Sequence, residues 1–329
     1  AAGVLFKVGM DSNLVFGTTG FPEAFGAAGG TIGTGAGALA ALVFCLFLFA
    51  IYWPVVKRRA RRDRTGQADS YGALSATVFL TVVPVIISSS VYNINSVIDN
   101  GIMAHGMESL GQGEEFLALW GIYNNKYMLL VHVPLAIANS LSSSLIPSLS
   151  GAVATKDRAA VLSKTGLAVR FAMVIAIPSA VGLAVLAEPI TQLLFGGENG
   201  EAIRMLAYGS SAVVFLSLST VTNAILQGIN RMHVPVRNAF FALILHTGAL
   251  YVMLMVFRMG IYSMVYANIL FAVLMCLFNA WSIRRAIRYR QEIRKTFLLP
   301  AAAALVMGAA AWGVWRGGAF LLPQELAVL

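Results

Sequence analysis

The chain has 329 residues, of which 58% are hydrophobic and 11% are charged, and its formal net charge at pH 7 is +9. Soluble domains contain about 25% charged residues, so this composition excludes a soluble protein and predicts an integral membrane protein. The basic residues lie at the ends of apolar runs and are not interleaved with aromatic residues, so no nucleic-acid partner is expected. Both cysteines, Cys45 and Cys276, lie within apolar runs, which favours buried thiols over a disulfide or a metal site.

The first segment, residues 1–29, is half apolar and rich in glycine, and it has no charged leader. We interpret it as the end of an earlier helix followed by an external loop. The chain is therefore expected to be the back part of a longer protein.

Eight apolar segments follow, each close to the roughly 20 residues that a helix needs to cross a bilayer core. They cover residues 30–53, 72–95, 124–148, 165–187, 205–227, 234–257, 260–283 and 296–315. Membrane β-strands are not expected, because they would show alternating segments of about 10 residues. The sequence predicts an all-α integral membrane protein, a polytopic bundle with about eight transmembrane helices.

The basic residues give this topology an orientation. Six of them follow the first span between Lys57 and Arg64, which is typical of a cytoplasmic helix end. If that loop is cytoplasmic, the loops at 149–164, 228–237 and 284–295 are cytoplasmic too, and together these ends hold 17 of the 23 Lys and Arg residues. The opposite ends hold Lys7, Lys126, Arg204, Arg258 and Arg316. This asymmetry supports the eight-span topology.

Polar side chains mark a candidate cavity. On a helix, Ser88, Tyr92, Asn95 and Asp99 form one stripe, and Ser89, Asn93, Ser96 and Asn100 form another. Polar groups are costly against lipid, so at least one stripe is expected to face other helices or water. Asp99 is either an ion or proton site, a partner for a cation, or a side chain exposed in the outer headgroup region.

Further candidates lie on later spans. Lys126 could pair with Asp99 across a cavity mouth or extend to the membrane interface. Arg170 lies about a turn inside the fourth span, where its guanidinium could meet phosphate oxygens of a substrate or of lipid. Asn223 could line an inner vestibule or bind neighbouring helices. His132 and His246 are each expected to make ordinary helix contacts.

The chain contains no GxxxxGK[ST], HExxH, GxSxG or CxxC motif, and its longest predicted cytoplasmic loop is under about 20 residues. We therefore do not expect an enzyme.

Three sequence segments resemble motifs of a known family. They are PSAVGLAVLAEPI at 178–190 with LLFG at 193–196, SLIPSLS at 144–150, and NAILQG at 223–228 followed by VPVRNA at 234–239. They are similar to the C-terminal lobe of the multidrug/oligosaccharidyl-lipid/polysaccharide exporter superfamily, in its stage V sporulation protein B-like and MurJ-type flippase branch. The resemblance implies two six-helix lobes with extra helices around a central cavity. It divides the chain into the end of a first lobe (1–56), an inter-lobe linker (57–71), the second lobe (72–283), a basic loop (284–295) and an accessory helix with a tail (296–329).

The function implied by the resemblance is translocation of an undecaprenyl-diphosphate-linked saccharide across the bacterial cytoplasmic membrane by alternating access. Its partners would be that substrate, membrane lipids and proteins of cell-wall synthesis, and no cofactor is expected beyond a coupling ion or the membrane potential. The family's best-known cavity arginines lie in the first lobe, so none of their roles passes to a residue here. The alternatives are a cation-coupled multidrug exporter and a non-transporting membrane scaffold.

Overall fold

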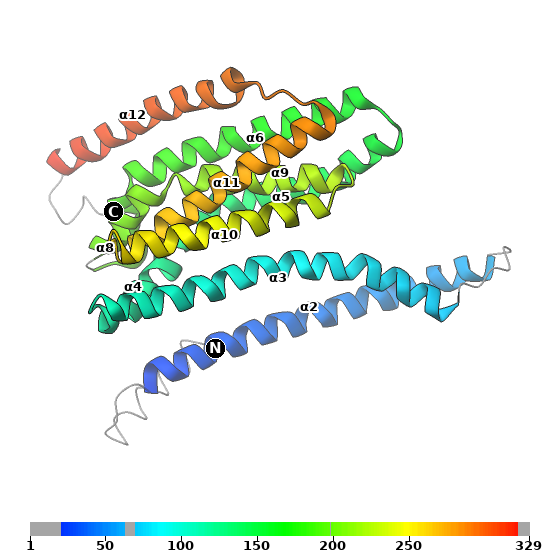
Figure 1. Ribbon diagram of the computed structural model, residues 1–329, viewed down its shortest axis with the longest axis horizontal. Helices are drawn as coiled ribbons and strands as arrows, with labels where there is room; N and C mark the ends of the chain where they lie inside the picture. The colour runs from blue at the N-terminus through cyan, green and yellow to red at the C-terminus, as the bar shows by residue number, and fades with distance from the viewer. Residues whose placement is uncertain (1–20, 63–69, 198, 322–329) are drawn as a thin grey trace. The chain divides into compact units, whose positions relative to one another are not determined.

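The computed structural model describes residues 21–62, 70–197 and 199–321, although some side chains within 21–34, 59–62, 77–93 and 318–321 lie outside the described part. Every regular element in these ranges is a helix (Figure 1), which confirms the all-α prediction. Most of the leading segment expected at 1–29 falls outside the described residues. The chain forms two compact units, Ala1–Ser75 and Ala76–Leu329, and each is described by itself.

The first unit contains α2 (Phe21–Arg62). Within it, Gly35–Arg58 is long and apolar enough to cross a membrane. Leu42, Phe47 and Trp53 are exposed within this unit, and a helix that is apolar on all sides suits a lipid environment. Helix α2 continues through Lys57, Arg58 and Arg61, so the first basic residues of the expected linker lie on its last turns.

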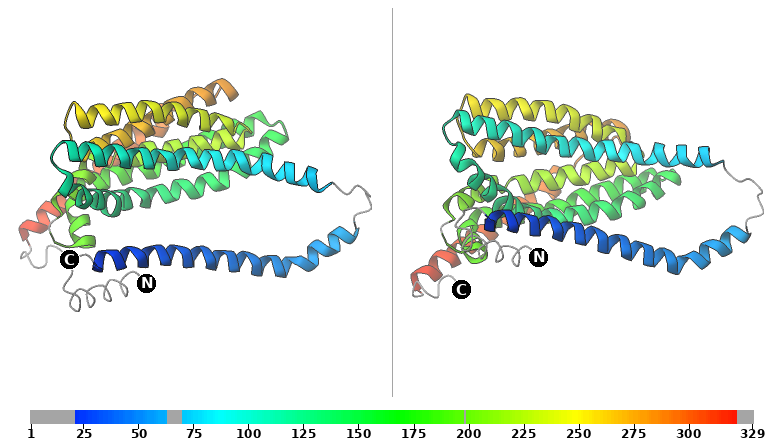
Figure 2. Two further views of the ribbon diagram at one scale, coloured as in Figure 1. Left: turned by 60° about the horizontal axis from the view of Figure 1, so that its bottom comes forward. Right: turned by 90° about the horizontal axis from the view of Figure 1, so that it is seen from below.

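The second unit is a helical bundle, drawn from further directions in Figure 2. Its elements are α3 (Tyr71–Ser109, from residue 76 on), α4 (Gly113–Ile122), the π-helical turn η1 (Tyr123–Met128), α5 (Leu129–Ala154), α6 (Arg158–Val185), α7 (Ala187–Phe195), α8 (Gly200–Gly209), α9 (Ala212–Gly228), α10 (His233–Met255), α11 (Tyr262–Ile287), η2 (Arg294–Leu298) and α12 (Leu299–Leu321). Helix α9 lies at the centre, because it packs against α5, α6 and α11. Helix α10 packs on α11, and α12 packs on α6.

The eight predicted spans all fall on helices. Among the described residues, six helices are long and apolar enough to cross a membrane, and the pair α8 and α9 makes a seventh if it is one bent span. Helix α3 covers the remaining predicted span at 72–95, where many side chains lie outside the described part. The third span is longer than predicted, since α4, η1 and α5 continue from Gly113 to Ala154.

Two predicted spans are interrupted. The span at 205–227 was predicted as one helix, but α8 and α9 meet at a 51° bend after Gly209. Gly209 and Ser210 lie at this break, and glycine–serine pairs are frequent sites of kinks. The span at 165–187 ends at Leu186, where α6 gives way to α7. Pro189 lacks the amide hydrogen that would bond the carbonyl of Val185, so the helix cannot continue unbroken there.

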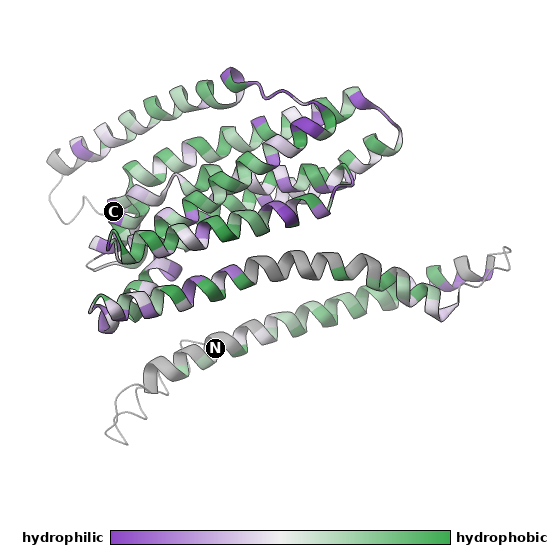
Figure 3. Cartoon of the chain, viewed as in Figure 1, coloured by the Kyte–Doolittle hydropathy of each residue, from purple (hydrophilic) through white to green (hydrophobic). Residues whose placement is uncertain are grey.

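Three of the loops predicted to be cytoplasmic lie together in the second unit (Figure 1). The junctions α5–α6, α9–α10 and α11–η2 are found at one end of the bundle in Figure 1, and Figure 3 shows hydrophilic residues gathered at these helix ends while the helices between are mostly apolar. This placement agrees with the two-sided topology predicted from charge, because all three loops were assigned to the cytoplasmic side.

Four non-glycine residues in the described ranges have a left-handed backbone: Lys156, Asn230, Arg258 and Arg288, with φ between 51° and 61°. Each follows the last turn of a helix, namely α5, α9, α10 and α11. This conformation costs an L-residue about 1–2 kcal/mol, and glycine adopts it freely. Three of these four helix ends are therefore closed by a basic residue where glycine would be less strained.

Candidate functional site

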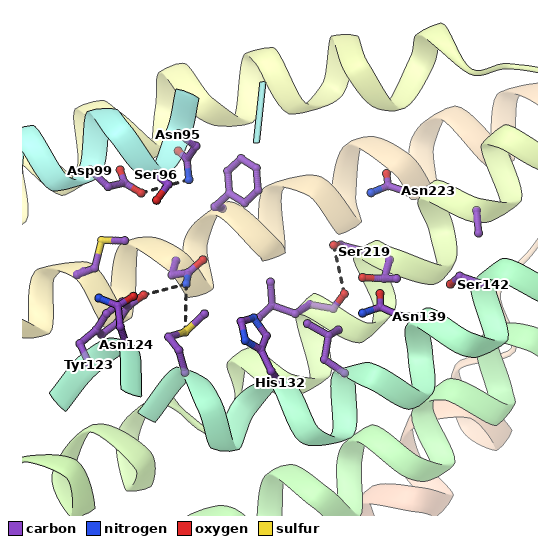
Figure 4. Close-up of a pocket in the computed structure, with 18 of the residues that line it drawn as sticks. Asn95, Ser96, Asp99, Tyr123, Asn124, His132, Asn139, Ser142, Ser219 and Asn223 are labelled. Atoms are coloured by element: carbon purple, nitrogen blue, oxygen red, sulfur yellow. Dashed lines mark hydrogen bonds between the residues drawn. The ribbon is translucent and has the colours of Figure 1, made fainter. Parts of the chain in front are cut away.

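A cavity of about 870 Å³ lies inside the second unit, between α3, α4 with η1, α5, α9 and α11 (Figure 4). Amide and hydroxyl side chains dominate its polar lining, among them Asn139, Ser142, Ser219 and Thr220. The aromatic rings of Trp120, Tyr123 and Phe271 also line it. The cavity combines groups that can donate or accept hydrogen bonds with flat apolar faces.

Helix α3 brings Asn95, Ser96 and Asp99 to this cavity, as Figure 4 shows. Asn95 Nδ2 donates a hydrogen bond to Asp99 Oδ2 at 3.1 Å, across the one-turn spacing that places both on one face. Asp99 is completely buried, so the alternative that it is exposed in the outer headgroup region is wrong. Of the other residues in the two predicted stripes, Asn100 is exposed and is not part of the cavity lining. The side chains of Ser88, Ser89, Tyr92 and Asn93 lie outside the described part.

Asp99 has a second partner that the sequence did not indicate. Its Oδ1 lies 2.7 Å from Nε2 of His246 on α10, and both side chains are inaccessible to solvent. Nδ1 of the same ring lies 2.9 Å from the carbonyl oxygen of Ala267 on α11. The imidazole therefore joins three helices at the wall of the cavity.

The opposite part of the cavity is held by a network of amides. Asn279 of α11 donates to Asn223 Oδ1 at 2.7 Å and to Thr222 Oγ1 at 3.1 Å, both on α9. Asn238 of α10 donates to Asn279 Oδ1 at 2.9 Å and to Ser282 Oγ at 3.3 Å. Asn223 both lines the cavity and binds neighbouring helices, so the two alternatives weighed for it hold together.

Lys126 lies elsewhere. Its Nζ donates to Asn199 Oδ1 and lies 5.5 Å from the centre of the Phe195 ring. The proposed pairing of Lys126 with Asp99 is therefore absent, because the lysine is engaged by residues around the end of α7 and the start of α8.

Arg170 also lies apart from the cavity lining. Its Nη2 forms an ion pair with Glu292 Oε2 at 2.5 Å, and the two side chains are 41% and 56% exposed. Neither lysine nor arginine is among the described residues that line the cavity. Of the six predicted site residues, the structure brings Asn95, Asp99 and Asn223 to this cavity and leaves Lys126 and Arg170 outside its lining.

A pairing between a histidine and an acidic residue on separate apolar helices was not predicted from the sequence. His246 and Asp99 are 147 residues apart, and each lies within a largely apolar stretch of the sequence. Ionisable residues within membrane segments usually pair with each other, and this rule could have suggested the contact.

A family model described as "Lipid II flippase MurJ" matches residues 1–317. The chain is 27% identical over 194 residues to the uncharacterized membrane protein YabM of Bacillus subtilis, a match that covers 58% of this chain and 36% of YabM. It is 24% identical over 196 residues to the lipid II flippase MurJ of the same organism, covering 56% of this chain and 36% of that protein. The match thus spans about a third of the length of these relatives. The chain belongs to the MurJ family of lipid II flippases, multi-pass proteins of the bacterial cytoplasmic membrane.

Proposed function

We propose that this chain supplies one wall of the transport cavity in a flippase for a lipid-linked saccharide precursor of the cell envelope. The observation that carries the proposal is the cavity of about 870 Å³, which places amides, hydroxyls and aromatic rings inside an apolar bundle. The matched family and its curated relative support a lipid-linked substrate.

The chemistry of the wall suits a saccharide. Sugar hydroxyls donate and accept hydrogen bonds, and the side chains of Asn139, Thr220 and Asn268 can do both. Trp120 and Tyr123 present rings, 5.5 Å apart and stacked, on which the apolar face of a sugar can lie. The substrate that we propose is an undecaprenyl-diphosphate-linked saccharide, with its sugars against this wall and its lipid tail in the bilayer.

The diphosphate is assigned to a different part of the protein. A doubly charged group in a membrane cavity needs cationic partners, and the described lining holds neither lysine nor arginine. Lys126 and Arg170 remain candidates for phosphate contact only if they leave Asn199 and Glu292. The proposal therefore gives this wall the role of a saccharide site in an alternating-access cycle.

The experiment is reconstitution of the intact protein in vesicles with a fluorescent lipid-linked saccharide and an impermeant quencher. Vesicles with protein are expected to translocate the lipid, and protein-free vesicles are not. The proposal would be overturned if a normally folded protein binds the lipid-linked saccharide but moves it no faster than protein-free vesicles do.

A cation-coupled multidrug exporter is the second candidate, and the buried carboxyl of Asp99 favours it. The pairing of Asp99 with His246 counts against a cationic drug at this carboxyl, because Oδ1 of Asp99 already faces the imidazole. Efflux of a cationic dye from the same vesicles, without movement of the lipid, would favour this candidate. A scaffold without transport would show neither activity.

A further inference from the structure

The geometry around His246 fixes where its protons can be. Nδ1 faces the carbonyl oxygen of Ala267, which can only accept a hydrogen bond, so Nδ1 carries a hydrogen. In a neutral ring, Nε2 is then a bare acceptor. It lies 2.7 Å from Oδ1 of Asp99, a hydrogen-bond distance that two acceptors do not reach without a proton between them.

We propose that Asp99 and His246 together form a proton-binding site of the cavity, which takes up and releases one proton as a unit. The proposal deepens the proposed function and rests on it for the link to transport. With the proton on either Oδ1 or Nε2, the pair has no net charge. When the proton leaves, a carboxylate faces a neutral imidazole, and the pair carries a charge of −1.

The residues around the pair make the free-energy cost of this negative charge large. No lysine or arginine lines the described part of the cavity, so a negative charge there has no cationic partner. Asn95 of α3 donates to the other carboxyl oxygen, Oδ2, at 3.1 Å. Tyr123 of η1 is a titratable group that interacts electrostatically with Asp99. Its hydroxyl accepts a hydrogen bond from Asn268 of α11 at 3.0 Å.

The Asp99–His246 pair lies beside the cavity and also connects two helices. Asp99 and Asn95 are among the residues that line the cavity, so the pair lies directly at the cavity wall. The pair also joins α3 to α10, which approach closely near Gly106, where a Cβ would lie 2.2 Å from Cδ2 of Leu254. Loss of the proton places two acceptors against each other at this helix contact, so protonation favours the docked arrangement of α3 and α10.

The test separates a proton site from a fixed hydrogen bond. In D99N the new amide can donate to Nε2 of neutral His246, so the contact is kept while the exchangeable proton is lost. Nitrogen-15 NMR of the intact, histidine-labelled protein is recorded across the pH range in which it stays folded, with H246Q to assign the signal. We expect His246 and the Asp99 carboxyl, followed by infrared spectroscopy, to change in a single shared step that D99N abolishes. An unchanged His246 signal, or the same step in D99N, would overturn the proposal.

Transport provides the second measurement. Vesicles with a pH gradient and a fluorescent lipid-linked saccharide should show a gradient-dependent rate for the wild type, which D99N loses. His105 is exposed on α3 outside the cavity, so H105Q is the matched control and should keep the dependence. Wild-type dependence in D99N would show that the proton site is not linked to transport. If the wild type moves no lipid but His246 titrates with Asp99, the proposed function fails and the proton site stands.

Discussion

The phenol ring of Tyr127 occupies the space where a side chain on Gly209 would begin. A Cβ on Gly209 would lie 2.5 Å from the ring, and the Tyr127 hydroxyl donates to the carbonyl oxygen of Gly209 at 3.1 Å. Tyr127 is fully buried on η1, so it cannot turn away at low cost. This contact fixes the end of α8 against η1, next to the bend before α9.

Gly209→Ala is expected to destabilise the protein by about 1–3 kcal/mol, because overpacking forces the tyrosine or the backbone to move. Thermal unfolding in detergent measures the effect. Gly200→Ala on the same helix is the control, since no atom lies within 4 Å of its added Cβ. Equal unfolding temperatures for the two variants would contradict the prediction.

Asn279→Leu is expected to destabilise the bundle by roughly 1–3 kcal/mol, because Asn238 then keeps only its longer hydrogen bond to Ser282 in a buried site. The double variant N238L/N279L removes both partners and should recover part of that loss. Denaturant unfolding of the two single variants and the double variant measures the coupling. Strictly additive losses would show that the two amides do not act together.

Arg170→Ala is expected to lower stability by no more than about 1 kcal/mol, because its ion pair with Glu292 is about half exposed. Saccharide binding should be unchanged, since Arg170 does not line the cavity. Binding of a lipid-linked saccharide to the detergent-solubilised protein tests this, with Glu292→Gln as the matched variant. A large loss of affinity in R170A alone would return Arg170 to the substrate site.

Asn139→Trp is expected to reduce lipid translocation strongly, because the indole fills part of the cavity beside α5. Asn139→Ala removes the same amide but leaves the space open, so it should retain more activity. Translocation rates in vesicles compare the two variants, after each is shown to unfold at the wild-type temperature. If N139A is the more impaired of the two, the amide matters more than the space.

Much of the fold could be predicted from sequence because lipid leaves a spanning segment few choices. Every backbone group must be satisfied within the segment, so an apolar run of the right length becomes a helix. The span predicted at 234–257 is α10, Val234 and Pro235 included, with ends that differ by one or two residues. The break after Gly209 was missed because it accompanies a contact with Tyr127, which is 82 residues away in the chain.

Part of the candidate site could also be predicted from the sequence, because side chains repeat regularly around a helix. Helical periodicity placed Asn95 and Asp99 on one face, and both line the cavity. Periodicity could not find the partners of Lys126 and Arg170, because Asn199 and Glu292 lie between helices, where no repeat constrains side-chain direction. The network around Asn279 joins three helices and depends on their packing.

The left-handed residues that close α5, α10 and α11 have a consequence for how the protein is made. Lys156, Arg258 and Arg288 each hold a strained backbone that glycine would relieve by about 1–2 kcal/mol. Lys156 and Arg288 stand in loops that the positive-inside rule predicts to be cytoplasmic. We expect glycine at these two positions to stabilise the folded bundle and to weaken the charge asymmetry that orients the chain during insertion. At these turns, the predicted orienting charge is present together with a backbone strain of about 1–2 kcal/mol per residue.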